Sequence, residues 1–127
     1  MIVLDTHAWI WLASDPSRLS AKARRAVAQT PLGVAAISLW EVSMLVTHGR
    51  IRFDRPVRQW LDQALALPGI ELVPLDPEVA SHAGELGDTL HGDPADRLIV
   101  ATTLVRGAKL VTKDLRIRGS GIVQTIW

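Results

Sequence analysis

Short runs of apolar residues alternate along the chain with longer segments in which apolar positions recur at helical spacing. The short runs are continuously apolar, which is typical of strands covered on both faces of a parallel sheet. We expect five such strands, at residues 1–5, 33–38, 70–75, 108–112 and 121–126. Helices are expected near residues 6–13, 20–29, 39–47, 55–67, 78–87 and 94–106. This alternation predicts an open α/β sheet with right-handed crossovers, in which ligands bind beyond the carboxyl ends of the strands.

Length and composition predict one globular domain over residues 1–127, because 48% of the residues are apolar and 21% are charged. No apolar run is long enough to cross a bilayer, and the opening "MIVLDTHAWIWLA" lacks the basic region and cleavage site of a signal peptide. We therefore expect a cytoplasmic protein that does not associate with membranes. The absence of cysteine excludes disulfides and thiolate metal sites.

The net charge of +1 becomes informative when some of the acids are set aside. With 14 basic and 13 acidic side chains, four acids gathered in one pocket would leave a surplus of five positive charges elsewhere. Such a surplus suits a polyanionic partner, although the same side chains could simply solvate helix faces.

An aspartate followed by a proline occurs three times, at Asp15-Pro16, Asp76-Pro77 and Asp93-Pro94. Aspartate at the N-cap accepts a hydrogen bond from a free backbone N–H, and proline at the first helical position loses nothing by lacking its own. Asp15 and Asp76 have no other acids around them that would suggest chemistry. We therefore interpret Asp93 as a helix cap.

Asp96 lies in the same stretch, "GDPADRLIVATTL", but on the helix face of Ile99 and Val100. A carboxylate on an inward face is costly unless another group pairs with it. Asp96 could also be the third-position acid of a capping box, and the local sequence leaves both interpretations open.

Three further acids lie where partners for Asp96 are expected. Asp5 closes the first strand, Asp114 follows the fourth, and Glu41 lies one turn into a helix that we expect Ser38 to cap. Each acid alone could serve a turn or a cap, but all of them fall on the carboxyl side of the sheet. Clustered carboxylates raise one another's pKa values unless cations neutralise them, and clusters without His or Cys prefer Mg²⁺ or Mn²⁺. Such ions can activate water to hydrolyse a phosphodiester, so no nucleophilic Ser or Cys is needed.

The segments "IVLDTHAWIW", "AISLWEVSML", "GDPADRLIVATTL" and "AKLVTKD" resemble the PIN-domain ribonucleases, and most closely the VapC-type toxins of type II toxin–antitoxin pairs. The resemblance covers essentially the whole chain. It implies a three-layer α/β/α sandwich with a central, mostly parallel sheet and the activity of a Mg²⁺- or Mn²⁺-dependent endoribonuclease.

The resemblance also assigns site residues. The family's acidic quartet falls on Asp5, Glu41, Asp96 and Asp114, of which Asp5, Asp96 and Asp114 are the expected metal ligands. Supporting hydroxyl groups fall on Thr6, Ser38 and Thr112.

Membership of this family further implies an RNA substrate, a cognate antitoxin that covers the active-site groove, and a homodimer. We expect part of Trp9, Ile10, Trp11 and Leu12 to form the antitoxin groove, with Trp9 and Leu12 in the core.

For RNA contacts we favour Arg97, Lys113 and Arg116, and rank Arg50, Arg52, Arg55 and Arg58 below them. The five tryptophans are expected to pack in the core, and no histidine is expected to act as a general base.

Three alternatives belong to other classes. A receiver domain of a phosphorelay would show adjacent acids after the first strand, and a phosphatase of the aspartyl-nucleophile kind would have aspartate in place of His7. A PIN-like scaffold that binds RNA without cutting it stays open, although all four acids are present.

Overall fold

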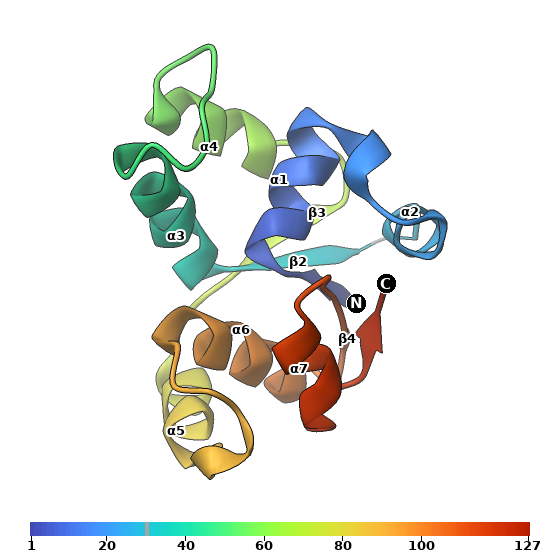
Figure 1. Cartoon of the computed structure of the whole chain (residues 1–127), viewed down its shortest axis with the longest axis vertical. Coiled ribbons are helices and arrows are strands. Elements are labelled where there is room, and N and C mark those ends of the chain that lie inside the picture. The colour runs from blue at the N-terminus through green and yellow to red at the C-terminus, as the bar shows by residue number, and fades with distance from the viewer. Residues whose placement is uncertain (30) are drawn as a thin grey trace.

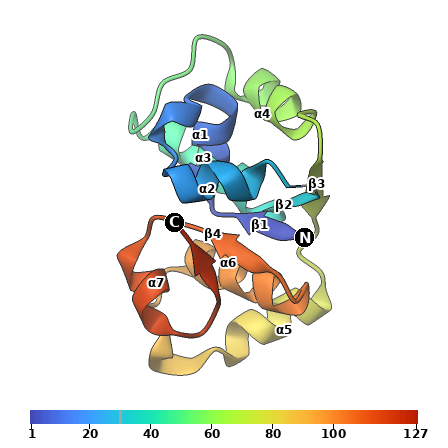
Figure 2. The ribbon, with the colours of Figure 1, turned by 90° about the vertical axis from the view of Figure 1, so that its right-hand side faces the viewer.

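The computed structural model describes residues 1–29 and 31–127 as a parallel sheet between two layers of helices (Figures 1 and 2). The strands are β1 (Ile2–Leu4), β2 (Leu32–Ala35), β3 (Ile70–Val73), β4 (Lys109–Val111) and β5 (Thr125–Ile126). They lie in the order β3-β2-β1-β4-β5, and every pairing is parallel. The expected three-layer α/β/α sandwich is confirmed.

The helices connect these strands in the crossovers that a parallel sheet requires. They are α1 (Thr6–Ser14), α2 (Ala21–Val27), α3 (Ala36–Thr47), α4 (Val57–Leu65), α5 (Pro77–Glu85), α6 (Pro94–Val105) and α7 (Leu115–Ser120). Two short 3₁₀ turns occupy Pro16–Arg18 and Gly87–Thr89. Within residues 1–29 and 31–127, no helix combines the length and the apolar character that a bilayer crossing needs.

Helices cover both faces of the sheet, and consecutive strand residues point to opposite faces, so neighbouring residues of one strand are buried in different clusters. In β1, Leu4 joins the cluster formed with α1, α2 and α4, whereas Val3 joins the cluster formed with α6 and α7. In β4, Val111 and Leu110 divide in the same way. This double burial accounts for the continuously apolar strand sequences.

The start of α3 and the presence of α7 differ from the sequence-based expectation. Strand β2 ends at Ala35, and α3 begins at Ala36, so Ser38 lies inside the first turn of α3 and does not cap it. Ala36 and Ile37 at the start of α3 are apolar like the buried strand before them, which is why the pattern extended the strand to residue 38. Helix α7 was not expected, since its six residues are too short to show a helical period.

The aspartate–proline device caps two of the three helices for which it was expected. Asp76 accepts the Val79 N–H at 2.9 Å, and Asp93 accepts the Asp96 N–H at 3.2 Å. Asp15 precedes the first 3₁₀ turn, but its carboxylate accepts from the Ser17 hydroxyl and makes no capping bond.

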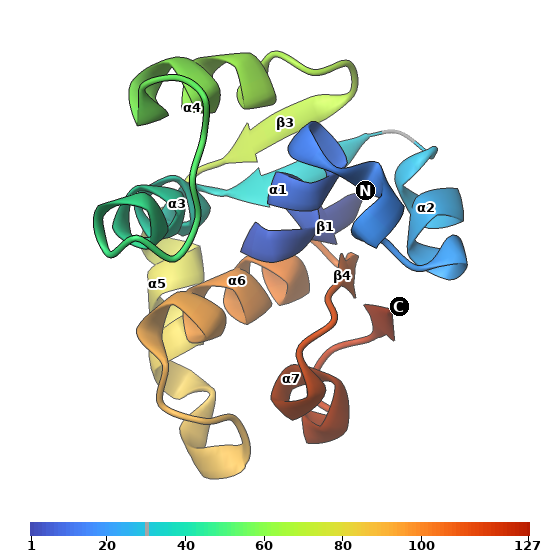
Figure 3. The same ribbon diagram turned by 45° about the horizontal axis from the view of Figure 1, so that its top comes forward.

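The topology brings the carboxyl ends of β1 and β4 side by side, because Leu4 pairs with Val111 in register. Helix α3 packs against α6 beside this edge of the sheet (Figure 3). Side chains that follow β1 and β4, or that lie near the starts of α3 and α6, are therefore close to one another.

Candidate active site

Four acidic side chains from four elements line one cavity of about 430 Å³ at this edge of the sheet. Asp5 and Asp114 follow β1 and β4, while Glu41 and Asp96 come from α3 and α6. The structure thus brings together all four acids singled out in the sequence, and Asp93 lines the same cavity.

Asp5 is buried and has two kinds of partner. Its Oδ1 accepts the backbone N–H of His7 at 3.2 Å, which caps α1, and its Oδ2 accepts the Thr112 hydroxyl at 2.5 Å. Burial raises the pKa of the Asp5 carboxyl, and the bond from Thr112 opposes that rise without cancelling it.

Two buried hydroxyl groups, those of Thr6 and Ser38, form a chain of hydrogen bonds that ends at the Glu41 carboxylate. The Thr6 hydroxyl donates to Oε1 of Glu41, and its oxygen lies 2.9 Å from the Ser38 hydroxyl oxygen. Burial raises the pKa of Glu41 to about 7, opposed by the Thr6 bond, and the nearby charges of Asp5, Asp96 and Asp93 raise it further. The Glu41 carboxyl therefore titrates near neutral pH in the absence of a cation.

Asp96 is only 8% exposed, and its Oδ2 lies 2.5 Å from Nε2 of His91. Burial raises the pKa of Asp96, His91 opposes this rise, and the charges of Asp93 and Asp5 add to it. The helix-face argument from the sequence placed Asp96 inward correctly. Its close partner, however, is a histidine five residues earlier in the chain.

Asp114 behaves differently from the other three acids. Its partial burial alone would raise its pKa, but the backbone N–H groups of Arg116 and Ile117 and the Arg116 guanidinium together lower it. Asp114 also caps α7 through these two N–H groups, at 2.8 and 3.3 Å. It is therefore the acid of the four that carries its charge most readily.

The donor set fits a hard divalent cation. Carboxylate oxygens are the ligands that Mg²⁺ and Mn²⁺ prefer, and three of the carboxyl groups have pKa values raised by burial and by one another. A cation between them would relieve that repulsion. Among the described residues, no three Asp, Glu or His side chains are drawn together closely enough to enclose an ion by themselves. Asp5, Glu41 and Asp96 instead bond to Thr112, Thr6 and His91.

A profile of the PIN domain matches residues 2–119 of the sequence. The chain belongs to the PIN-domain family. Ribonuclease VapC22 of Mycobacterium tuberculosis is 42% identical to this PIN domain over 118 residues, which make up 92% of this chain and 89% of the relative. The sequence-based resemblance to the VapC type is thereby confirmed.

Solved structures share the fold of this PIN domain at low sequence identity. VapBC2 from Rickettsia felis bound to a promoter DNA fragment aligns with a TM-score of 0.70 at 16% identity, covering 98% of this chain and 97% of that chain. A toxin–antitoxin complex from Klebsiella pneumoniae aligns with a TM-score of 0.68 at 18% identity, covering 97% and 95% of the two chains.

The three hydroxyl residues expected to support the acids are buried beside two of them. Thr6, Ser38 and Thr112 are fully buried, and each belongs to the hydrogen bonds around Glu41 or Asp5. The Thr112 hydroxyl oxygen also accepts the backbone N–H of Asp114 at 3.0 Å, so one threonine joins two of the acids.

The basic residues expected to contact RNA divide into two groups. Lys113 and Arg116 line the acid-lined cavity, and Nη2 of Arg116 lies 3.4 Å from Asp114 Oδ2 and 3.8 Å from Asp96 Oδ2. Arg97 instead donates to the carbonyl oxygens of Ala83, Gly87 and Leu90, where it joins the end of α5 to α6. Its guanidinium therefore stabilises the connection between α5 and α6.

Two residues of the site, His91 behind Asp96 and Arg50 in the cavity, were missed or ranked low from the sequence. His91 was not expected to matter, because a lone histidine in a loop gives no sign that it folds back onto Asp96. Arg50, ranked below Lys113 and Arg116, lines the same cavity as they do. Its position depends on how the loop after α3 returns over the sheet, which local sequence does not reveal.

Proposed function

We propose that this PIN domain is a Mg²⁺- or Mn²⁺-dependent endoribonuclease and the toxin component of a toxin–antitoxin pair, acting on RNA in the cytoplasm. The observation that carries the proposal is the meeting of four carboxylates in one cavity, with the pKa of three of them raised. The similarity to ribonuclease VapC22 supports RNA as the substrate.

In this proposal Asp5, Asp96 and Asp114 hold the cation, and Thr112 and His91 orient two of these ligands. When bound, the cation neutralises charge on the scissile phosphate and activates water for attack. Glu41 lines the same cavity and is the acid not assigned to the cation, so its carboxylate can accept a proton from the attacking water. Thr6 fixes the carboxylate for this task.

Positive side chains around the acids would bind the RNA backbone. Lys113, Arg116 and Arg50 line the cavity with the acids, and a basic rim attracts phosphates that the acids alone would repel. Arg97 was also an expected contact, but its bonds to carbonyl groups make it the weakest candidate of the set.

The proposed partners are a cognate antitoxin and a second copy of the chain. The Rickettsia felis structure is a VapBC complex, and the Klebsiella pneumoniae structure is a toxin–antitoxin complex. The acid-lined cavity is the surface that an antitoxin would need to cover to block cleavage. In α1, Trp9 and Ile10 are buried and Leu12 packs against the core, which leaves the half-buried Trp11, a residue of the acid-lined cavity, as the candidate for antitoxin contact.

The proposal is tested by cleavage of total RNA and transfer RNA in Mg²⁺, Mn²⁺ or EDTA by protein freed of any antitoxin. Asp96→Asn and Asp93→Asn are compared with wild type, because Asp93 caps α6 and asparagine caps equally well. We expect discrete products that require the metal and are lost only with Asp96→Asn. Metal-independent binding of RNA without cleavage would favour the RNA-binding scaffold. Loss of cleavage with Asp93→Asn alone would show that Asp93 is more than a cap.

A further inference from the structure

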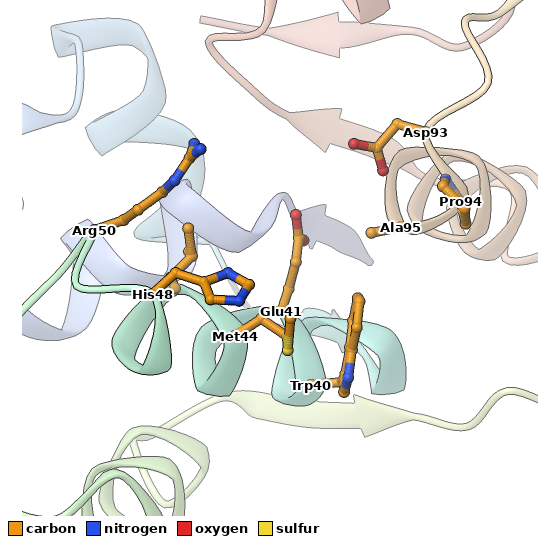
Figure 4. A pocket seen from close by; sticks show the side chains of 9 residues that line it. Trp40, Glu41, Met44, His48, Arg50, Asp93, Pro94 and Ala95 are labelled. Carbon is orange, nitrogen blue, oxygen red and sulfur yellow. The ribbon is translucent and has the colours of Figure 1, made fainter.

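A second, smaller cavity of about 280 Å³ lies between α3 and the start of α6 (Figure 4). Trp40 and Met44 of α3 form one side, and Pro94 and Ala95 at the start of α6 form the other. Glu41, Leu45, Arg50 and Asp93 line both cavities. A polymer lying across the acids can therefore extend into the second cavity without leaving the protein surface.

Trp40 is the tryptophan found among the exposed large apolar side chains of the described residues. Its side chain is 55% exposed, whereas Trp9 and Trp60 are buried against each other with ring centroids 5.2 Å apart. Trp11 already has cations near its ring, Arg18 at 4.9 Å and Lys113 at 5.8 Å. In the described part of the chain, no aromatic ring or cation stacks on Trp40. The expectation that all five tryptophans pack in the core is wrong for this one.

We propose that the second cavity is a base-binding subsite, in which Trp40 stacks on the base of a nucleotide next to the scissile phosphate. This inference rests on the proposed function. An exposed indole beside a site for phosphodiester chemistry supplies the flat apolar surface that an unpaired base needs. Met44 and Pro94 provide apolar walls, and Arg50 offers a positive charge between the two cavities, where the backbone of the RNA would pass.

The lining that this cavity shares with the acid-lined cavity favours RNA over a protein partner as the occupant. The apolar surface is confined to one small cavity, and its margin carries the polar side chains of Glu41, His48, Arg50 and Asp93. Arg50 contributes to both cavities and suits a chain that carries phosphate on either side of the base.

The test uses a single-stranded RNA oligonucleotide that spans a mapped cleavage site, and a second copy with an abasic nucleotide beside the scissile bond. Wild type, Trp40→Ala and Trp40→Phe are compared, and Leu75→Ala serves as a control because Leu75 is a half-exposed apolar residue outside both cavities. We expect Trp40→Ala to raise KM by about 5- to 150-fold with little change in kcat, and Trp40→Phe to restore most of the loss. The abasic oligonucleotide should impair wild type but add nothing to the defect of Trp40→Ala.

The outcomes separate this inference from the proposed function. Cleavage by wild type with an unchanged KM for Trp40→Ala would overturn the subsite and leave the nuclease in place. If Trp40→Ala instead weakened only antitoxin binding or self-association, the surface would belong to a protein partner, and the subsite would again be overturned. If wild type cleaved no RNA with either metal, the proposed function would fail. Fluorescence anisotropy of a labelled single-stranded RNA of mixed sequence with wild type and Trp40→Ala would then decide the subsite, because equal affinities would contradict it.

Discussion

Helices α5 and α6 start in the same way and differ at the third helical position. Asp76 and Asp93 cap them, a proline follows each cap, and each carboxylate accepts an N–H three residues ahead. The third residue is Val79 in α5, which is 1% exposed, and Asp96 in α6, which is 8% exposed.

The two buried residues have different surroundings. Val79 packs against Ala83 and Ala101 in an apolar cluster between α5 and α6. Asp96 faces the cavity beyond the ends of β1 and β4, where it meets other carboxylates. The local cap therefore determines where each helix begins. The position of that start relative to the sheet determines whether an inward-facing residue enters the apolar core or the acid-lined cavity.

The largest effects are expected from changing these two buried residues. Asp96→Asn should reduce metal-dependent cleavage by about 100-fold or more, because an amide is not an anionic ligand. Its melting temperature without metal should stay at or above that of wild type, since burial disfavours the charged carboxylate. Val79→Asp should destabilise the fold by about 3 kcal/mol or more, because its carboxylate would be buried without a partner.

Thermal unfolding, together with cleavage rates at a temperature where each variant is folded, checks this prediction. If Asp96→Asn unfolded as readily as Val79→Asp, Asp96 would have a structural role and its assignment as a metal ligand would be wrong.

A smaller effect is expected at the histidine beside Asp96. His91→Ala should weaken Mn²⁺ binding by about 10- to 100-fold, because Asp96 would lose the group that orients it. His91→Gln should recover much of the affinity, since its amide can donate to the same carboxylate. His82→Ala, on the exposed side of α5, is the matched control. Calorimetric titration with Mn²⁺ measures all three variants, and unchanged affinity in His91→Ala would remove His91 from the site.

The smallest effect concerns the pH dependence of stability without metal. Burial raises the pKa of Glu41 from 4.5 to about 7, so between these pH values the folded state keeps a proton that the unfolded state has released. The free energy of unfolding should therefore fall as pH rises through this window, and level off above it. Glu41→Gln should remove part of this slope, whereas Glu78→Gln, exposed in the first turn of α5, should leave it unchanged.

Melting temperatures in EDTA across this pH range test the prediction. Equal slopes for wild type and Glu41→Gln would contradict the assignment of the raised pKa to Glu41. Added Mg²⁺ should raise the melting temperature of wild type most at the upper end of the range, where the carboxyl groups are ionised.

Much of the fold could be predicted because the sheet is buried on both faces. Continuous apolar runs at residues 1–5 and 108–112 contain the central strands β1 and β4. The start of α3 was misplaced because the apolar strand β2 continues directly into Ala36 and Ile37 of the helix, with no polar residue between them. Trp40 was concealed because it stands among other apolar residues of α3, and the sequence does not reveal which of them faces outward.

The acids could be predicted because their positions follow from chain topology. Asp5 and Asp114 end neighbouring strands, and parallel strands bring such residues to one edge. The contact between His91 and Asp96 could not be predicted in this way, because it depends on the path of a loop. The same holds for Arg50, which reaches the cavity only when the loop after α3 folds back.

The central claim is that the four acids form a site for a divalent cation. Calorimetric titration of the antitoxin-free protein with Mn²⁺, with wild type beside Asp96→Asn, tests it most directly. We predict saturable binding by wild type at neutral pH, accompanied by proton release, and binding at least about 10-fold weaker in Asp96→Asn. Equal affinity in the two proteins, or no binding by folded wild type, would contradict the claim.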